Sequence, residues 1–278
     1  NQLIEYNTSN GLPSDVIYNV LQDKKGYIWI ATDNGIVKFN GSTFKKFQLN
    51  EGLPSNDIFG LAVDSKNRIW IGTFSGTAMI DENNQVTNFE NSNTVLKGKC
   101  ITSMDEDENG NIYFTLYEFE RKEKGKINND EGIAIRYTDG TFKQFTTENS
   151  GMPFNHTNCV VYDKNEKVLW ISTDRAGLVR YDLKDGWENY HNENSEIPTS
   201  YILIFDIRAI LAVISGSKPN LFSFSVQHLL HASFSLQPLF QPEVFWLLPA
   251  FSADLLLALP FPAVLLPVLL FSVQVFSL

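Results

Sequence analysis

Cysteine is scarce in this 278-residue sequence, and basic residues are outnumbered by acidic ones. The two cysteines, Cys100 and Cys159, are too few for a disulfide scaffold, so they leave the redox compartment open. Lys and Arg total 22 against 32 Asp and Glu, a net charge of −10, which argues against a nucleic-acid partner and against docking on an anionic membrane surface. The sequence begins at Asn1 without an initiator Met or a signal-peptide pattern, as a processed secreted protein or a fragment would.

Turn-forming residues are missing from one part of the chain. Residues 1–202 are rich in Gly, Asn, Asp and Lys, which mark many short turns. Residues 203–278 contain one Gly, no Tyr and five charged side chains, together with 18 Leu, 10 Phe and seven of the 11 prolines. We therefore divide the chain into two regions of different kinds, residues 1–202 and residues 203–278.

Internal repetition is the strongest signal in the first region. Residues 11–41 read GLPSDVIYNVLQDKKGYIWIATDNGIVKFNG, and residues 52–82 read GLPSNDIFGLAVDSKNRIWIGTFSGTAMIDE. Twelve of these 31 positions are identical at a spacing of 41 residues, without a gap. A fixed period of this length is typical of repeat architectures.

Each repeat reads as four short strands separated by turns. In the first repeat the strands are VIYNVLQD, YIWIAT, IVKF and TFKKFQL, and the last two are separated by Asn40-Gly41. Asn-Gly between apolar runs is a strong hairpin signal, because both central residues of a type I′ turn need positive φ. Four antiparallel strands in about 40 residues is the spacing of a propeller blade. We therefore predict an all-β fold, a β-propeller of four-stranded antiparallel blades.

Further copies of the repeat follow, but they match the first two less well. A third copy contains GNIYFTL, a fourth contains GMPFNHTNCVVYD and VLWISTDRAGLVRYD, and a fifth opens at SEIPTSYI and stops. The shared register predicts about four blades, each with one large aromatic side chain at an equivalent buried position. These side chains are Trp29, Trp70, Tyr113 and Trp170.

The pattern GLPS..I..L..D..G.IWIGT..G resembles the two-component regulator propeller repeat, and the resemblance covers residues 3–201. It implies a segment of a seven-bladed propeller from the sensor region of a hybrid histidine kinase. Such a region lies on the periplasmic or extracellular side of a bacterial inner membrane, detects carbohydrate breakdown products and is often followed by an immunoglobulin-like sandwich. This sequence departs from the family because it has about four blades and no kinase element.

Strand direction predicts which loops share a face. The second-to-third and fourth-to-first connections return to one face, where polar and planar groups suit sugar hydroxyls and carboxylates. The residues that we expect to contact a ligand there are Asp15, Asp33, Asn34, Asp57, Phe74, Asn155, His156, Asp174 and Arg175. Ser14, Asn56 and Ser75 are expected on the same face. The competing interpretation is that Asp, Asn and Ser at these places only form turns.

Other candidate features are weaker. Residues 117–132 form an insertion that reads as a solvated hairpin or as a lid. The stretch DEDENG at residues 105–110 resembles the start of a calcium loop, but an ordinary hairpin turn explains it better. His228 and His231 lack further metal ligands nearby. Cys100 and Cys159 could form a bridge, with buried thiols as the default. We expect no metal and no cofactor, and no catalytic motif is present.

Two classes of function remain open beside an enzyme. The leading hypothesis is a ligand-sensing module with an oligosaccharide ligand, other propeller or sandwich domains of a parent sensor as partners, and a homodimer. The alternative is a protein-interaction platform without a small ligand, and a propeller lyase or hydrolase comes third. No nucleic acid is expected, and a membrane is a partner only if the C-terminal region is genuine coding sequence.

The region 203–278 has two interpretations. Leu255 to Leu278 is 24 residues without a charge, long enough to span a membrane. Pro260, Pro262 and Pro267 interrupt this run, and no basic flank sets its orientation. The second interpretation is a reading frame lost near residue 202, where the repeat breaks. We favour the lost frame, because the region is inconsistent with the fold that precedes it.

Overall fold

Four antiparallel sheets make up the part of the chain that the computed structural model describes, which is residues 4–89, 94–117, 131–195, 197, 200 and 202. The first sheet has strands β1 (Ile17–Gln22), β2 (Ile28–Thr32), β3 (Gly35–Phe39) and β4 (Phe44–Phe47). The second has β5 (Ile58–Val63), β6 (Ile69–Thr73), β7 (Gly76–Ile80) and β8 (Val86–Asn88). The third has β9 (Met104–Glu106), β10 (Ile112–Thr115), β11 (Ile133–Arg136) and β12 (Phe142–Phe145). The fourth has β13 (Thr157–Asp163), β14 (Val168–Thr173), β15 (Leu178–Tyr181) and β16 (Trp187–Tyr190).

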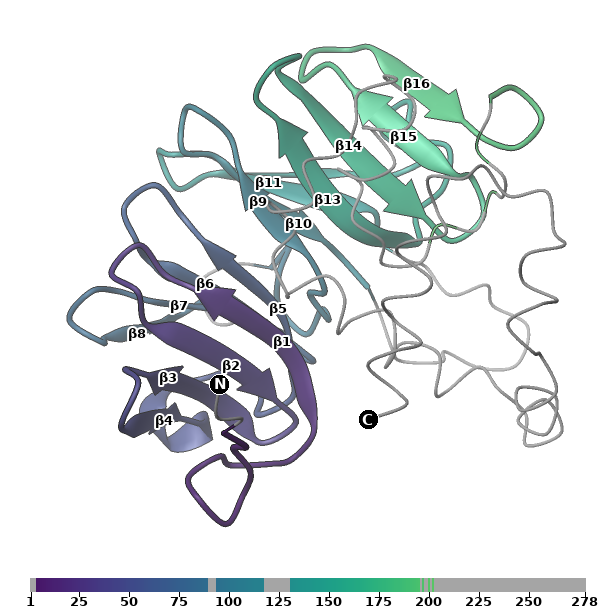
Figure 1. Cartoon of the computed structure of the whole chain (residues 1–278). Helices are drawn as coiled ribbons and strands as arrows, with labels where there is room; N and C mark the ends of the chain where they lie inside the picture. Colours follow the sequence, from purple (N-terminus) through teal and green to yellow (C-terminus); the bar gives the residue numbers. More distant parts are fainter. Residues whose placement is uncertain are drawn as a thin grey trace, which may run out of the picture. The chain divides into compact units, whose positions relative to one another are not determined.

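In every sheet the strands pair in chain order, so each sheet is one up-and-down meander (Figure 1). A short 3-10 turn, η1 (Leu49–Glu51), links the first sheet to the second. The prediction of an all-β fold of four-stranded antiparallel blades is therefore confirmed, and we number the sheets as blades one to four.

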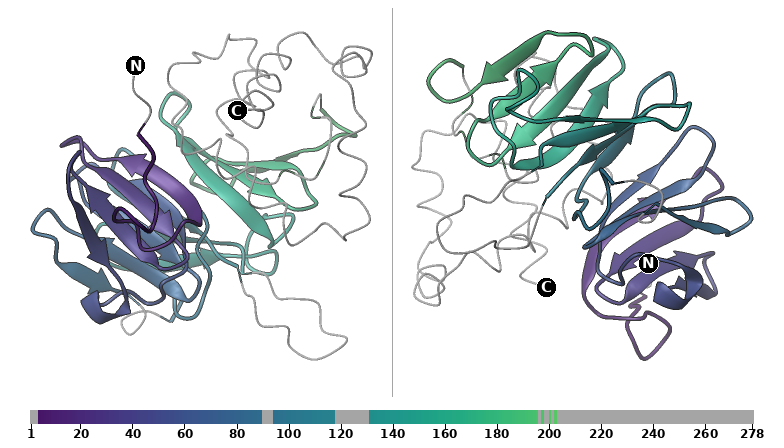
Figure 2. Two further views of the ribbon diagram at one scale, coloured as in Figure 1. Left: turned by 60° about the horizontal axis from the view of Figure 1, so that its bottom comes forward. Right: turned by 180° about the vertical axis from the view of Figure 1, so that it is seen from behind.

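Neighbouring blades share their apolar cores. One cluster joins Trp29 and Phe47 of blade one to Ile58 and Ile71 of blade two. Two further clusters join blade two to blade three and blade three to blade four in the same way. Figure 2 shows the same succession of sheets from two other sides. Extensive contacts between described strands of different blades all join neighbours in the chain, so none links blade one to blade four.

The four equivalent aromatic side chains are all buried. Trp29, Trp70 and Tyr113 lie in the clusters between blades, and Trp170 lies in a cluster of blade four with Ile197 and Ile202. Trp29, Trp70, Tyr113 and Trp170 have exposed fractions of 1%, 0%, 2% and 6%. Each stands on the second strand of its blade, opposite a residue of the first strand. Trp29, Trp70 and Tyr113 are buried by side chains of two sheets, which explains why a single blade would not be stable alone.

The first three aromatic side chains are held by an aspartate at the end of the first strand. Trp29 Nε1 donates to Asp23 Oδ2 at 2.9 Å, and Trp70 Nε1 donates to Asp64 Oδ2 at 3.0 Å. The Tyr113 hydroxyl donates to Asp107 Oδ2 at 2.8 Å. These three aspartates are nearly completely buried. The pairing fixes both the hairpin turn and the ring, because each carboxylate also accepts two backbone N–H groups of its turn.

Blade four lacks this pairing. Its hairpin between β13 and β14 is one residue longer, and the Asp163 carboxylate accepts from the backbone N–H groups of Asn165 and Glu166 but not from Trp170. The indole nitrogen of Trp170 is buried without a hydrogen-bond partner. The aromatic side chain is kept in place by packing against residues such as Tyr190.

The start of each repeat closes the blade that precedes it. Gly35 N donates to Asn56 O at 2.7 Å, Gly132 N donates to Asn155 O at 3.0 Å, and Gly177 N donates to the carbonyl of Ser200 at 2.9 Å. These three glycines begin the third strands with φ of 98°, 70° and 79°, where the backbone of the fourth strand leaves no room for a side chain.

The fifth copy of the repeat continues this scheme as far as it is described. Ile202 N donates to Thr173 O at 3.1 Å, as Ile101 N donates to Thr73 O at 3.0 Å in the second blade. Ile197 is buried, like Leu12 and Leu53 at the same place in the repeat. Ile197, Ser200 and Ile202 therefore keep the structural roles of their counterparts in the earlier repeats.

Several expectations lie outside the described residues. These are residues 118–130 of the insertion at 117–132, His228, His231 and the region 203–278. Within the described ranges no helix is long and apolar enough to cross a membrane. Cys100 and Cys159 are both buried thiols, so the bridge between them does not form.

Candidate ligand-binding face

The two ends of the sheets differ in their chemistry. We define the upper end as the starts of the first strands together with the turns between second and third strands. Backbone bonds place these segments side by side, since Phe74 N donates to Asp57 O at 3.0 Å and Asp174 N donates to His156 O at 3.1 Å. The lower end holds the turns between first and second strands, including those at Asp23, Asp64 and Asp107. All nine residues expected to contact ligand lie at the upper end, but in different environments.

Asp15 and Asn155 are occupied by the preceding loop. Asp15 Oδ1 accepts from Thr8 N at 2.7 Å, and Asn155 Oδ1 accepts from Thr147 N at 2.7 Å. Asn56 does the same for Leu49 N at 2.9 Å. A side-chain oxygen after the GLPS segment therefore caps the previous loop in three blades. This role agrees with the turn-forming interpretation of these residues.

Asn34 is also engaged within the fold. Its Nδ2 donates to Pro13 O at 3.1 Å, and its Oδ1 accepts from Gln48 Nε2 at 2.9 Å. These bonds tie the turn after β2 to the start of the repeat and to the end of β4. An exposed asparagine with both amide atoms bonded has little capacity left for a ligand.

Asp33 and Asp57 form an acidic pair beside Tyr18. Asp33 Oδ1 is buried and has no hydrogen-bond partner. Burial raises the pKa of Asp57, and the nearby Asp33 carboxylate raises it further. Burial, Asp33 and then Asp57 likewise raise the pKa of the Tyr18 phenol. Buried oxygens without donors are costly in a fold, so they mark a place where an external donor would bind well.

Aromatic rings border this acidic pair on one side. The Tyr18 and Phe59 ring centroids are 5.0 Å apart, and the two residues are equivalent in the first and second repeats. Asp57 also adds to the pKa increase that burial produces at the Cys100 thiol, so blade three begins next to the pair. Rings beside carboxylates offer stacking surfaces and acceptors together, which is the combination that sugar rings require.

A second aromatic contact lies in blades three and four. The rings of Tyr117 and His156 have centroids 4.7 Å apart. Phe74, at the turn after β6, is 42% exposed, which is unusual for a large apolar side chain of this protein. His156 and Phe74 are thus expected site residues that present ring surfaces at the upper end.

Asp174 and Arg175 pair with each other. Arg175 Nε lies 3.6 Å from Asp174 Oδ2, and the guanidinium carbon of Arg175 lies 6.0 Å from the Phe154 ring centroid. The Arg175 side chain is 67% exposed, so the ion pair holds it weakly. This guanidinium is a cation available at the rim of the upper end.

Sequence reasoning missed Tyr18, Phe59 and Tyr117. The signal was present for the first two, because they align at a period of 41 residues on the first strand of each blade. The stretch DEDENG is a hairpin turn, in which Asp107 Oδ1 accepts from Asn109 N and Asn111 N. In the described part of the chain no group of three His, Cys, Asp or Glu side chains is placed to hold a metal ion.

Residues 11–34 and 52–75 match the family model of the two-component regulator propeller. These two segments are two-component regulator propeller repeats. They contain the GLPS segments, the first two strands of blades one and two, and the turns that carry Asp33 and Phe74. Both matched segments lie in the first two blades, and blades three and four lie outside them. No curated protein sequence matches the chain.

Solved structures agree on the fold. The chain is similar to the extracellular domain assigned to the hybrid two-component system BT3049 from B. thetaiotaomicron, with a TM-score of 0.53 and 23% identity over 66% of this chain and 24% of that one. It is also similar to the extracellular domain of BT4673 from the same organism, with a TM-score of 0.51 and 19% identity over 64% of this chain and 22% of that one. A streptogramin B lyase is similar with a TM-score of 0.50 and 18% identity, over 64% of this chain and 55% of the lyase chain.

These likenesses show the fold alone, a β-propeller. The chain spans about a quarter of the length of the two extracellular domains. What those proteins sense and assemble with is therefore a matter for proposal here.

Proposed function

We propose that the chain is a segment of an extracytoplasmic sensor propeller of a two-component system, and that its upper end contacts the ligand. The observation that carries this proposal is the acidic pair of Asp33 and Asp57 beside the rings of Tyr18 and Phe59. The two-component regulator propeller repeats and the extracellular domains among the similar structures support the sensor context. The location that follows is the periplasmic or extracellular side of a bacterial inner membrane.

The ligand class that fits the upper end is a neutral oligosaccharide. Sugar hydroxyls donate hydrogen bonds to carboxylates, and the Asp33 and Asp57 side chains are only half-buried, so their accessible oxygens could accept them. The apolar face of a sugar ring stacks on aromatic side chains such as Tyr18, Phe59 and the exposed Phe74. An anionic ligand would be repelled by the acidic pair, since like charges close together are unfavourable.

A binding experiment on the full chain tests this proposal. We would titrate short oligosaccharides of glucose, xylose and mannose into the protein by calorimetry and follow thermal unfolding in parallel, because a ligand that binds only the native state stabilises it. Asp33→Ala and Tyr18→Ala should weaken binding by about tenfold each, as the loss of a charge-assisted hydrogen bond or of a stacking surface does.

Asp139→Ala is the matched control, since Asp139 is an exposed aspartate of the hairpin between β11 and β12 that bonds to Thr141. It should leave binding unchanged. Equal loss in the control and in Asp33→Ala would contradict the placement of the site. If no oligosaccharide binds and the chain instead captures one protein from an extracellular fraction, the interaction-platform hypothesis is correct.

The proposal assigns no reaction to this segment. A lyase shares the fold, but the comparison with it carries no information on catalytic residues at 18% identity. A histidine kinase, sandwich domains or further blades would belong to the parent protein, and a homodimer through the parent sensor is part of the same proposal. These partners can be tested by light scattering of the complete sensor.

A further inference from the structure

A pocket lies at the lower end of the sheets, between blades two and three, whereas the acidic pair lies at the upper end. Its volume is about 180 Å³. It is lined by Ser65, Lys66 and Arg68 of the turn before β6, by the turn between β9 and β10, and by Arg136 and Thr138. Three of these side chains are cations, in a protein whose net charge is −10.

Arg136 is the most unusual group in this pocket. Its Nε is buried without a hydrogen-bond partner, and its Nη1 makes only a long contact of 3.5 Å with Tyr137 O. The guanidinium stacks on two rings, 5.6 Å from the Trp70 centroid and 5.8 Å from that of Phe89. No carboxylate in the described part of the chain forms an ion pair with it, so most of its donors have no acceptor from the protein.

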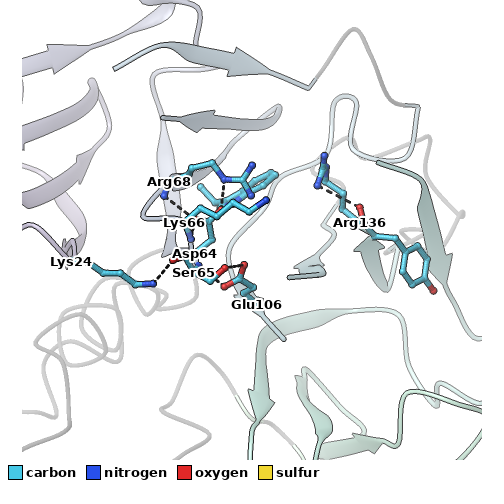
Figure 3. A network of polar contacts seen from close by, with 9 residues as sticks. Lys24, Asp64, Ser65, Lys66, Arg68, Glu106 and Arg136 are labelled. Carbon is cyan, nitrogen blue, oxygen red and sulfur yellow. Dashed lines mark hydrogen bonds and ion pairs between the residues drawn. The ribbon is translucent and has the colours of Figure 1, made fainter. Parts of the chain in front are cut away.

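A second guanidinium approaches the same indole. Arg68 Nε pairs with Asp64 Oδ2, and the guanidinium carbon of Arg68 lies 5.8 Å from the Trp70 centroid. Burial lowers the pKa of Arg136, the positive charge of Arg68 lowers it further, and Asp139 opposes both. In Figure 3 the side chains of Lys66, Arg68 and Arg136 extend toward the same space. Arg68 has Asp64 as its counter-ion, whereas Arg136 forms no ion pair within the described residues, so an anion beside Arg136 would relieve the repulsion between the two guanidinium groups.

The acidic groups around this space are occupied. Glu106 accepts from Ser65 N and, at 2.9 Å, from Ser65 Oγ, which also orders the turn that Lys24 Nζ contacts (Figure 3). Glu108 accepts from Lys167 Nζ at 2.6 Å, on the side of blade four. Glu108 is therefore neutralised by Lys167, and Glu106 makes its hydrogen bonds with Ser65 and not with Arg136.

We propose that this pocket binds the oxyanion group, a carboxylate or a sulfate, of a small acidic ligand no larger than one sugar ring. Guanidinium groups bind planar or tetrahedral oxyanions through pairs of N–H donors, and Arg136 and Arg68 are positioned by stacking on Trp70 before the ligand arrives. Lys66 is exposed at the rim and adds a mobile ammonium charge. The volume limits the ligand, because sites for larger molecules measure about 300–1,000 Å³.

Calorimetric titrations of the full chain at low, constant ionic strength test the proposal. The probes are sodium sulfate, sodium acetate, glucuronate and glucose, where glucose is the neutral match of glucuronate. We expect saturable binding of sulfate, acetate or glucuronate and none of glucose. Sulfate and acetate separate the two kinds of oxyanion, and glucuronate tests whether a sugar ring fits beside the charge.

Three variants locate the binding. Arg136→Gln should weaken anion binding by about tenfold, the expected loss of one charge-assisted pair. Lys66→Gln should weaken it about threefold, and this exposed side chain makes no bond on which folding depends. Arg180→Gln removes the same charge from an arginine that pairs with Glu166 and Glu188 in blade four, and it should change nothing.

The proposal is wrong if the wild-type chain binds no anion saturably, if glucose binds as well as glucuronate, or if Arg180→Gln weakens binding as much as Arg136→Gln. Thermal unfolding of each variant shows whether it is folded, and Lys66→Gln decides the question if Arg136→Gln does not fold. The site is independent of the upper end, so Asp33→Ala must leave anion binding intact.

Discussion

The two ends of the blades use the same residue, aspartate, for opposite purposes. At the lower end Asp64 is 1% exposed and accepts from Trp70 Nε1, from Arg68 Nε and from two backbone N–H groups. At the upper end Asp33 has a buried oxygen without any donor, and the pKa of Asp57 is raised. A buried carboxylate with all its bonds made stabilises the fold, whereas one with a missing bond costs stability and is available for binding. The comparison separates the aspartates that stabilise the blades from those that are available to bind a ligand.

The largest loss of stability is expected from truncation of Trp70, the buried ring that donates to Asp64 at the lower end. Trp70→Ala removes a fully buried ring between blades two and three, and it should lower the free energy of unfolding by about 3–5 kcal/mol. Urea denaturation measures the change. Trp187→Ala, on the outer strand of blade four, is the control and should cost less, because this ring is only half-buried. Equal losses would mean that the seam between blades contributes no more than an edge.

The carboxylate itself comes next. Asp64→Ala leaves the Trp70 indole, the Arg68 guanidinium and two turn amides without their acceptor, at a cost of about 2–4 kcal/mol. Asp163→Ala, at the same place in blade four, removes an acceptor from only two turn amides and should cost about 0.5–1 kcal/mol. Thermal or urea unfolding of both variants gives the difference. A larger loss for Asp163→Ala would reverse the interpretation of the two turns.

A smaller loss of stability is expected when only the indole hydrogen bond is removed. Trp70→Phe and Trp170→Phe remove similar volumes, but only Trp70 Nε1 has an acceptor, Asp64, while Trp170 Nε1 is buried without one. Trp70→Phe should therefore cost about 1–2 kcal/mol more than Trp170→Phe. The two variants are compared under identical urea titrations. Equal costs would show that the lower-end pairing adds little beyond packing.

The smallest effect is expected at the upper end and has the opposite sign. The pKa of Asp57 is raised above its ordinary value of 3.8, so the folded chain holds this proton more tightly than the unfolded chain. Its contribution to stability is fully present below pH 3.8 and is lost as the pH rises through the folded-state pKa. Asp57→Asn should raise the urea midpoint slightly at pH 7 and reduce its dependence on pH. A lower midpoint at pH 7 would mean that the ionised carboxylate stabilises the fold.

The fold could be predicted from the sequence because its signals repeat. Four copies of one pattern place strands, turns and the positions of Trp29, Trp70, Tyr113 and Trp170 in a common register, and the antiparallel four-stranded sheets follow from alternation and turn chemistry. The pairing of Asp64 with Trp70 was also visible as a repeated aspartate six residues before the aromatic residue, although its meaning became clear only in three dimensions.

The candidate site could be predicted only in part. Strand direction identified the upper end, but residue type did not separate Asp33, which has an unsatisfied oxygen, from Asp15, which caps a loop. That difference depends on which backbone amide lies nearby, and no local pattern encodes it. The pocket around Arg136 was missed for a similar reason, since its cations come from two blades that are about 70 residues apart in the chain.

Gly177 N donates to Ser200 O, and Ile202 N donates to Thr173 O. A complete blade therefore begins and ends at different residues than one copy of the sequence repeat. A blade needs the opening segment of the following repeat to complete its upper end. Any shuffling of repeats, in evolution or by design, must therefore exchange segments that run from one Ile of the GLPS..I motif to the next. A boundary at the end of β16 would separate blade four from its own closure, whereas a boundary after Ile202 would preserve it.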